Sequence, residues 1–347
     1  MTSGSAPQWL TRNLRVLSLV SLLQDAASEL LYPLLPIYLT TVLGAPPSVV
    51  GAVEGAAEGA ASLTKIVSGP LGDRFARRPL IASGYGMAAL GKLIVAAAGA
   101  WPGVLAGRVV DRLGKGLRGA PRDALLVDGV EPAQRGRAFG FHRTMDTLGA
   151  VIGPLLGLAG YELFDHQIGP VLYLAVIPAV LSVLLIAWVR EPPRNLAKAK
   201  PASILDGTRR LPRRYWAVVS FLVLFSIANF PDALLLLRLK QIGYLGLGIT
   251  TDTATAWALI AAYGLFTACY DGVGKAWISA IVSAELQSSA QGVFQGLSGF
   301  AVLAAGLWAG FLWGVDGRLP LLISGGAGAV FALALLAAAA GTRRRAR

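Results

Sequence analysis

Acidic side chains interrupt the long apolar runs of this 347-residue chain at regular spacing. Asp25 and Glu29 lie one helical turn apart, and Glu54 and Glu58 repeat that spacing in the next run. Residues four apart share one face of a helix, so each pair of carboxylates faces the same way. Carboxylates in apolar surroundings are costly and tend to bind a proton, a cation or a basic side chain. The pattern therefore predicts a polar centre where a proton or a substrate competes for basic partners.

Basic and acidic residues that could complete this centre occur in later apolar runs: Arg108, Asp111, Arg112, Lys115, Asp232, Asp271 and Lys275. Static ion pairs that orient helices are the alternative interpretation. For the first four acids we favour function, because four carboxylates on two neighbouring helices exceed what pairing requires. For Arg112, Lys115, Asp271 and Lys275, structural pairing and gating both stay open.

Composition indicates an all-α membrane protein in the lipid bilayer. Hydrophobic residues make up 55% of the chain and charged residues 14%, whereas soluble domains carry about 25% charged residues. The net charge of +12 could suggest a nucleic-acid partner. Its Lys and Arg residues instead gather at the N-terminus, in alternate loops and at residues 343–347, which is the positive-inside pattern. We expect a multi-pass protein of the inner membrane whose two termini lie in the cytoplasm. We expect no nucleic-acid partner.

A spanning helix needs about 20 apolar residues, and the chain offers about ten such segments. The predicted spans are 14–43, 49–68, 80–98, 104–126, 135–163, 169–188, 216–237, 257–281, 290–313 and 319–340. A basic, proline-containing segment separates the sixth span from the seventh. We therefore expect an N-terminal six-helix half at 1–189, a cytoplasmic linker at 190–214 and a shortened four-helix half at 215–347. On the second span, Gly51, Gly55 and Gly59 predict close contact with another helix.

Residues 69–78, Gly-Pro-Leu-Gly-Asp-Arg-Phe-Ala-Arg-Arg, form a short charged loop between two predicted spans. The pattern resembles the signature loop of the major facilitator superfamily of transporters, whose key positions correspond to Gly69, Leu71, Asp73, Arg74, Arg77 and Arg78. The resemblance implies a helical bundle in two pseudo-symmetric halves and a cytoplasmic loop that locks the state open to the outside.

The chemistry of this loop suggests its partners. The carboxylate of Asp73 can accept from backbone N–H groups at a helix start and from an arginine on a facing helix. The three arginines can pair with acids at other cytoplasmic helix ends, such as Asp123, Asp128 or Glu131.

Two further features lie in the fifth span. Its Gly149, Gly153, Pro154 and Gly157 resemble the family's antiporter motif, which is associated with export; glycine packing alone is the alternative. His142 and Asp146 lie one turn apart. The histidine can titrate near neutral pH, although a structural histidine is the favoured interpretation. The runs 107–125 and 138–157 also resemble a bacterial permease subgroup of the superfamily.

An internal repeat relates the two halves. Residues 111–116 are echoed by 271–276, and the Gly136/Gly140 spacing is echoed by Gly292/Gly296. The last three spans then correspond to spans four to six. The second half is about 41 residues shorter before its echo, so we predict that the counterparts of spans two and three are missing and that 241–256 bridges the gap.

Enzyme signals are absent from the sequence. It has no phosphate-binding Gly-x-x-x-x-Gly-Lys-Ser/Thr run, and two histidines and one cysteine predict no soft-metal site or cofactor. We expect a secondary active transporter, monomeric, that exports a small-molecule substrate in exchange for protons by alternating access. The alternatives are a transport-incompetent truncated paralogue with a structural or binding role, and an importer or metal-chelate permease.

Overall fold

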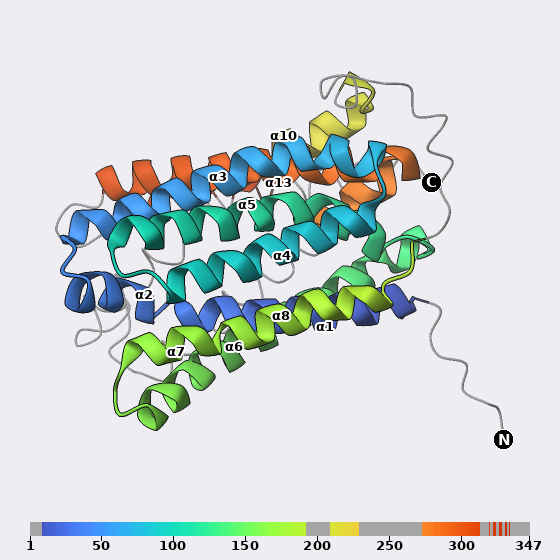
Figure 1. Ribbon diagram of the computed structural model, residues 1–347. Helices are drawn as coiled ribbons and strands as arrows, with labels where there is room; N and C mark the ends of the chain where they lie inside the picture. Colours follow the sequence, from blue (N-terminus) through green and yellow to red (C-terminus); the bar gives the residue numbers. More distant parts are fainter. Residues whose placement is uncertain are drawn as a thin grey trace, which may run out of the picture. The chain divides into compact units, whose positions relative to one another are not determined.

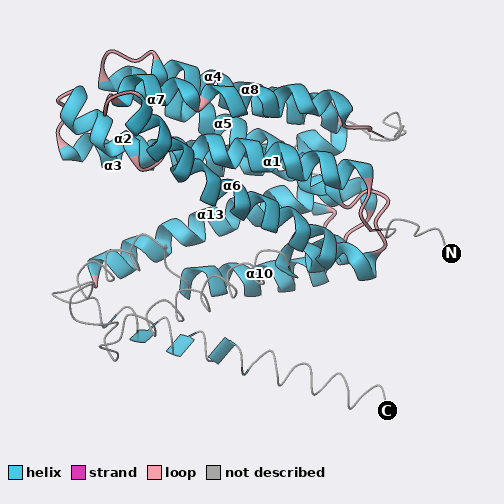
Figure 2. Cartoon of the chain, turned by 90° about the horizontal axis from the view of Figure 1, so that it is seen from below, coloured by secondary structure: helices cyan, strands magenta, loops and turns pink. Residues whose placement is uncertain are grey.

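A computed structural model describes residues 9–191, 209–228 and 273–312, with isolated positions at 319, 322, 323, 326, 327, 330, 331 and 333. Every regular element in these residues is helical, and Figure 2 draws no strand among them. The all-α class is confirmed. The predicted total of about ten spans stays a prediction, because 229–272 and most of 313–347 lie outside the described residues.

The first six predicted spans correspond to a continuous series of helices (Figure 1). These are α1 (Arg12–Leu31), α2 (Leu34–Ile37), the π-helical turn η1 (Tyr38–Val42), α3 (Pro47–Arg74), α4 (Arg77–Ala96), α5 (Trp101–Leu126), the turn η2 (Pro132–Gln134), α6 (Arg135–Leu163), α7 (Ile168–Leu174), α8 (Val176–Leu185) and the turn η3 (Ile186–Trp188). Later described elements are α10 (Arg213–Ala228), the helical segment 273–281, the turn η5 (Ala284–Leu286) and α13 (Gln287–Phe311).

Prolines explain where two predicted spans are divided. The prediction of one helix over 14–43 is wrong, because α1 ends at Leu31 and Pro33 precedes α2. A proline has no N–H to donate to the carbonyl four residues earlier, and its ring crowds that carbonyl. Pro178 has the same effect on the carbonyl of Leu174, where α7 ends. Pro154, by contrast, lies inside the continuous helix α6.

The signature segment is mostly helical, so the predicted loop at 69–78 is too long. Helix α3 continues through Pro70 to Arg74, and α4 begins at Arg77. Only Phe75 and Ala76 connect the two helices. Arg74 in the last turn of α3 suits the negative end of the helix dipole.

Helices α3, α5 and α4 pack side by side in that order, and Figure 1 shows α5 between its two neighbours. Glycines bring the backbones of α4 and α5 into contact. A Cβ on Gly91 would lie 2.5 Å from the carbonyl oxygen of Gly107, and one on Gly84 would lie 2.7 Å from that of Gly114. Such contacts place side chains of α3, α4 and α5 within reach of one another.

Helices α1 and α6 form a second close pair. The glycine stripe of α6, Gly149, Gly153 and Gly157, faces the backbone of α1; a Cβ on Gly153 would lie 2.6 Å from the carbonyl oxygen of Ala26. Gly149 meets the carbonyl of Leu22 in the same way. The glycines of the motif therefore have a packing role in this structure.

The glycine ladder of α3 behaves differently: Gly55 and Gly59 make no close helix contact of the predicted kind with any described residue. No described atom lies within 4 Å of a Cβ built on either residue. Close approaches of α3 lie elsewhere on the helix. A Cβ on Gly116 of α5 would lie 2.7 Å from the carbonyl oxygen of Ala61, and a Cβ on Gly292 of α13 would lie 2.7 Å from the Cα of Gly69.

The chain divides into two compact units, residues 1–215 with 268–296 and residues 216–267 with 297–347. In the second unit the indole nitrogen of Trp308 donates to the carbonyl of Ile227 at 2.9 Å, and the ring of Phe331 packs edge-on against Phe221 and Phe225. The predicted halves at 1–189 and 215–347 stay a prediction, since 192–208 of the linker lies outside the described residues.

Two described segments are long and apolar enough to cross a membrane by themselves, Arg77–Ala96 and Ile168–Trp188. The other long helices of the first unit carry more charged residues. Helix α5, for example, contains Arg108, Asp111, Arg112 and Lys115 within two turns. Their charges must be accommodated by packing against other helices.

Candidate functional site

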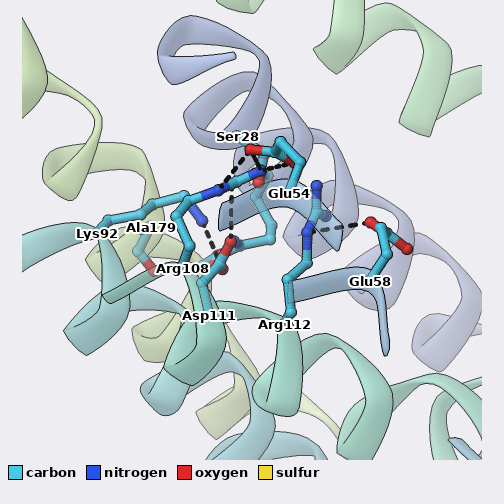
Figure 3. A network of polar contacts seen from close by, with 10 residues as sticks. Ser28, Glu54, Glu58, Lys92, Arg108, Asp111, Arg112 and Ala179 are labelled. Carbon is cyan, nitrogen blue, oxygen red and sulfur yellow. Dashed lines mark hydrogen bonds and ion pairs between the residues drawn. The ribbon is translucent and has the colours of Figure 1, made fainter. Parts of the chain in front are cut away.

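The polar centre of the first unit starts from an ion pair between α3 and α5 (Figure 3). The guanidinium of Arg108 donates from Nη2 to both carboxylate oxygens of Glu54, at 2.7 and 2.8 Å, and from Nε to Oε1 at 3.1 Å. Arg108 is only 2% exposed. This forked geometry is the strongest form of arginine–carboxylate pair, because two N–H donors are aligned with one carboxylate.

The pair continues into α4 through Asp111. Lys92 donates to Asp111 at 2.9 Å, and Arg108 lies 3.6 Å from the other carboxylate oxygen of Asp111. Lys92 is 1% exposed. The result is a charge-alternating chain, Glu54–Arg108–Asp111–Lys92, which crosses three helices; we call it the Arg108 chain. Each buried charge in it has an opposite partner, as burial requires.

A second pair lies one turn along the same two helices. Arg112 lies 3.2 Å from Glu58, so the four-residue spacing on α3 matches that on α5. The side chain of Glu58 is 53% exposed, whereas that of Arg112 is 11% exposed. Lys115, the next base on α5, is exposed and has no ion pair with any described residue. Of the two carboxylates of α3, Glu58 is therefore the more accessible to a ligand.

The acids of α1 lie near these bases without pairing. Asp25 and Glu29 are half-buried, and neither forms an ion pair with a described residue. The charge of Asp25 interacts with those of Lys115 on α5 and Asp146 on α6, and the charge of Glu29 interacts with that of Arg112. Two carboxylates thus remain available beside the paired bases.

At the signature-loop end of the helices, meaning the end of α3 that carries residues 69–74, Asp73 binds the start of α13. Its carboxylate accepts from the backbone N–H of Ser288 at 2.9 Å and from that of Ser289 at 2.6 Å. Helix N-termini carry unpaired N–H groups and the positive end of the helix dipole. Asp73 therefore satisfies donors that would otherwise be left unbonded.

The arginines of the signature segment have mainly backbone partners. Arg77 is buried, lies 3.6 Å from Asp73, and donates to the carbonyl of Ala284 at 3.3 Å. Arg78 donates to the carbonyl of Ala187 at 2.9 Å. The guanidinium of Arg74 lies over the ring of Phe75. These contacts replace the pairing with Asp123, Asp128 or Glu131 that the sequence suggested.

Asp123, which is fully buried, has other partners. Arg122 contacts its Oδ1 at 3.0 Å, while Lys275 of segment 273–281 and Gln295 of α13 contact its Oδ2 at 3.2 and 2.9 Å. We call these four residues the Asp123 cluster. Together with Asp73, it binds α3 and α5 to two segments that lie far along the chain.

His142 is buried between α1 and α6. Its Nδ1 lies 3.2 Å from the hydroxyl of Ser18, and its Nε2 lies 3.6 Å from Asp146. The nearby carboxamide of Gln24 accepts from Ser182 on α8 at 3.3 Å. Polar groups therefore continue along α1 toward the signature-loop end.

The structure adds residues to the predicted site and leaves others outside it. Lys92 was missed, although a lysine inside the predicted span 80–98 could have signalled it. The partner role of Gln295 had no signal in the sequence. Asp232 and Asp271 lie outside the described residues, whereas Lys275 is described and pairs with Asp123.

Helices joined through glycine contacts, with charge chains buried among apolar surfaces, define a membrane-embedded helical bundle with a polar interior. The sequence profile of the Major Facilitator Superfamily matches residues 17–250. The chain belongs to the major facilitator superfamily, whose members are integral membrane transporters.

Relatives of known sequence agree. An uncharacterized MFS-type transporter of Methanocaldococcus jannaschii is 24% identical over 367 aligned positions, which cover 90% of this chain and 91% of the relative. That alignment is longer than the 347 residues of this chain, so the relative carries residues that this chain lacks. The multidrug resistance protein MdtH of Photorhabdus laumondii is 35% identical over 127 residues, which cover 36% of this chain and 31% of that protein.

Solved structures share the fold. The human organic anion transporter MFSD10 has a TM-score of 0.69 at 17% identity, over 94% of this chain and 99% of that one. The Escherichia coli fucose:proton symporter FucP has a TM-score of 0.65 at 16% identity, over 94% and 98%. The recognition of the family and its helical-bundle fold is therefore confirmed.

Proposed function

We propose that this chain is a proton-coupled exporter of a small organic solute, acting as a monomer by alternating access. Both termini and the signature-loop end would face the cytoplasm. Support comes from family membership, from partial likeness to relatives named multidrug resistance proteins, and from a fold shared with a fucose:proton symporter. The glycine motif of α6 resembles a family motif associated with export.

The observation that carries the proposal is the contrast between the two pairs on α3 and α5. The carboxylate of Glu54 is tied to a nearly inaccessible arginine by a forked contact, and that arginine also faces Asp111. Glu58 is half-exposed and has one described basic partner, Arg112, at 3.2 Å. A proton or a solute can therefore reach Glu58 and replace Arg112, while the Arg108 chain stays closed.

Exchange follows from the charge on Glu58. A proton bound to Glu58 neutralises the carboxylate and releases Arg112, whereas a basic or hydrogen-bonding solute needs the ionised carboxylate. Proton and solute are then mutually exclusive on one group, which is the condition for antiport. Asp25 and Glu29 provide two more half-buried carboxylates beside the same bases for the solute to contact.

Alternating access also requires contacts that hold in one state and break in another. The capping of α13 by Asp73 and the Asp123 cluster are such contacts, because they close the signature-loop end between segments distant in the chain. A ligand shifts the balance between states only by binding one of them more tightly. The proposal assigns the closed signature-loop end to the state open to the outside.

The test is proton flux in proteoliposomes with a trapped pH indicator, using ethidium, tetraphenylphosphonium and norfloxacin as probes. Export predicts that at least one probe drives proton movement opposite to its own, and that Glu58→Gln abolishes it. Asp25→Asn should reduce it as well. Glu162→Gln is the matched control, because Glu162 is 63% exposed and lies away from the polar centre. Movement of probe and proton in the same direction would indicate import instead.

A transport-incompetent paralogue is the second candidate, and one observation favours it. The alignment with the M. jannaschii relative contains more positions than this chain has residues, which fits the proposed loss of two helices. This candidate predicts no proton movement with any probe while the purified protein remains folded and monomeric. Restoring the missing segment from the relative should then create flux where the natural chain has none.

A further inference from the structure

We propose that His142 and Asp146 form a proton-binding site, separate from Glu58, whose occupancy controls the Asp123 cluster. The inference rests on the proposed proton coupling and specifies a second group that carries it. The site lies where α6 packs against α1, next to the contacts that close the signature-loop end.

The geometry leaves a place for one proton. His142 is 3% exposed and Asp146 is 9% exposed, and Nε2 of the imidazole lies 3.6 Å from Oδ1 of the carboxylate. Neither atom has a hydrogen bond to any described group. We assign the tautomer in which Nδ1 donates to the Ser18 hydroxyl. In that tautomer Nε2 carries a lone pair, so two buried acceptors face each other. A proton between them converts this contact into a charge-assisted hydrogen bond.

The surrounding charges link that proton to the Asp123 cluster. Helix α5 contributes Arg122 and Asp123, and segment 273–281 contributes Lys275; the charges of all three act on the imidazole. A protonated His142 is attracted to Asp146 and Asp123 and is repelled by Arg122 and Lys275. Protonation therefore weakens the hold of Asp123 on Lys275, because the imidazolium competes for the same carboxylate.

Other polar and charged groups near His142 and Asp146 come from α1 and α6. On α1, Ser21 accepts from Arg122 at 3.1 Å, and the charge of Asp25 interacts with that of Asp146. On α6 itself, Arg143 follows the histidine and is half-buried. The charge of Asp25 thus interacts with both Lys115 of the polar centre and Asp146 of the His142 site. A proton that enters from the polar centre has a titratable group on its way to Asp146.

Coupling of this kind is reciprocal. If protonation of His142 loosens the Lys275–Asp123 pair, removal of Lys275 must make His142 bind its proton more tightly by the same factor. Loss of the charge on Asp146 must have the opposite effect, because an opposite charge within about 4–6 Å shifts a titration by about 1–3 pH units.

The chain makes this measurable, because His142 and His166 are its only histidines. Imidazole NMR signals of the full-length, histidine-labelled protein in nanodiscs give both titration curves, and His166→Asn assigns them. We expect Lys275→Met to raise the midpoint of His142 by about one pH unit and Asp146→Asn to lower it by about one or more. Glu162→Gln, which removes the partner of His166, should leave the His142 curve unchanged. If neither Lys275→Met nor Asp146→Asn changes the titration midpoint of His142, the proposal is overturned.

Flux measurements separate this inference from the proposed function. Probe-driven proton flux that His142→Gln leaves unchanged overturns the inference and leaves the proposed function in place. A His142 midpoint that responds to Lys275→Met, in a protein that shows no flux with ethidium, tetraphenylphosphonium or norfloxacin, supports the proton site and counts against the proposed function.

Discussion

Two sets of buried ion pairs in the first unit differ in what they join. The Arg108 chain connects α3, α4 and α5, and its terminal base, Lys92, has Asp111 as its carboxylate partner. The Asp123 cluster joins α5 to segments more than a hundred residues away, and Asp123 has three partners. Loss of Lys92 therefore leaves Asp111 with only the 3.6 Å contact to Arg108, whereas loss of Lys275 leaves Asp123 with two partners at hydrogen-bonding distance. We infer that the number of close partners, rather than burial alone, distinguishes a fixed ion-pair chain from a contact that can separate.

The largest loss of stability is expected when the Arg108 chain loses one of its charges. Lys92→Met leaves Asp111 buried with only the longer contact to Arg108. Breaking a buried pair in this way costs about 3–5 kcal/mol, and we expect a large drop in the thermal unfolding midpoint of the detergent-solubilised protein. The double variant Lys92→Met/Asp111→Leu removes both charges and should recover most of the loss. An unchanged midpoint for the single variant would show that the pair does not hold the scaffold.

A smaller loss of stability is expected when a side chain is added at the close contact between α4 and α5. In Gly91→Ala the new Cβ would lie 2.5 Å from the carbonyl oxygen of Gly107 and 2.6 Å from the backbone nitrogen of Asp111. Overpacking costs about 1–3 kcal/mol, measured by the same unfolding assay. Gly55→Ala is the matched control, because no described atom lies within 4 Å of its Cβ and alanine favours helix. Equal losses for the two variants would contradict the packing assigned to α4 and α5.

The Asp123 cluster should lose less stability than the Arg108 chain when one of its charges is removed. Lys275→Gln leaves Asp123 with Arg122 and Gln295, so we expect a stability cost of only about 1 kcal/mol. The closed state should become less populated by a factor of about five. A single cysteine at Ser288, in a Cys269→Ser background, should then react faster with a membrane-impermeant maleimide, since Ser288 is buried when Asp73 caps α13. If Lys275→Gln destabilises as much as Lys92→Met, the distinction between the two sets fails.

The smallest change is expected at an exposed ion pair, which serves as the control for the Arg108 chain and the Asp123 cluster. Glu162 and His166 form an exposed pair at 3.4 Å, with side chains 63% and 62% exposed. Exposed pairs contribute less than about 1 kcal/mol because solvent screens them and ordering them costs entropy. Glu162→Gln should therefore leave the unfolding midpoint and the maleimide reaction almost unchanged. A shift comparable to that of Lys275→Gln would mean that partner number is not what separates these pairs.

Sequence reasoning identified the family, the helical class and the paired spacing of Glu54 and Glu58, because these depend on local pattern. It did not identify Lys92, since the partner of a buried charge depends on which helix faces it. The glycine ladder at Gly55 and Gly59 shows the same limit: spacing says which residues share a face, but the rotation of the helix decides what that face meets. The continuation of α3 through Pro70 to Arg74 was missed because the charged, glycine-containing segment 69–78 was interpreted as a loop.

The glycine stripe that seats α6 on α1 has a mechanical consequence. Two backbones in contact over several turns resist sliding and tilting against each other, so these helices move as one body whenever the transporter rearranges. Ser18, His142 and Asp146 are mounted on that single body. Under the proposed function, a proton bound at this site would move together with α1 and α6 and would cross no interface between them.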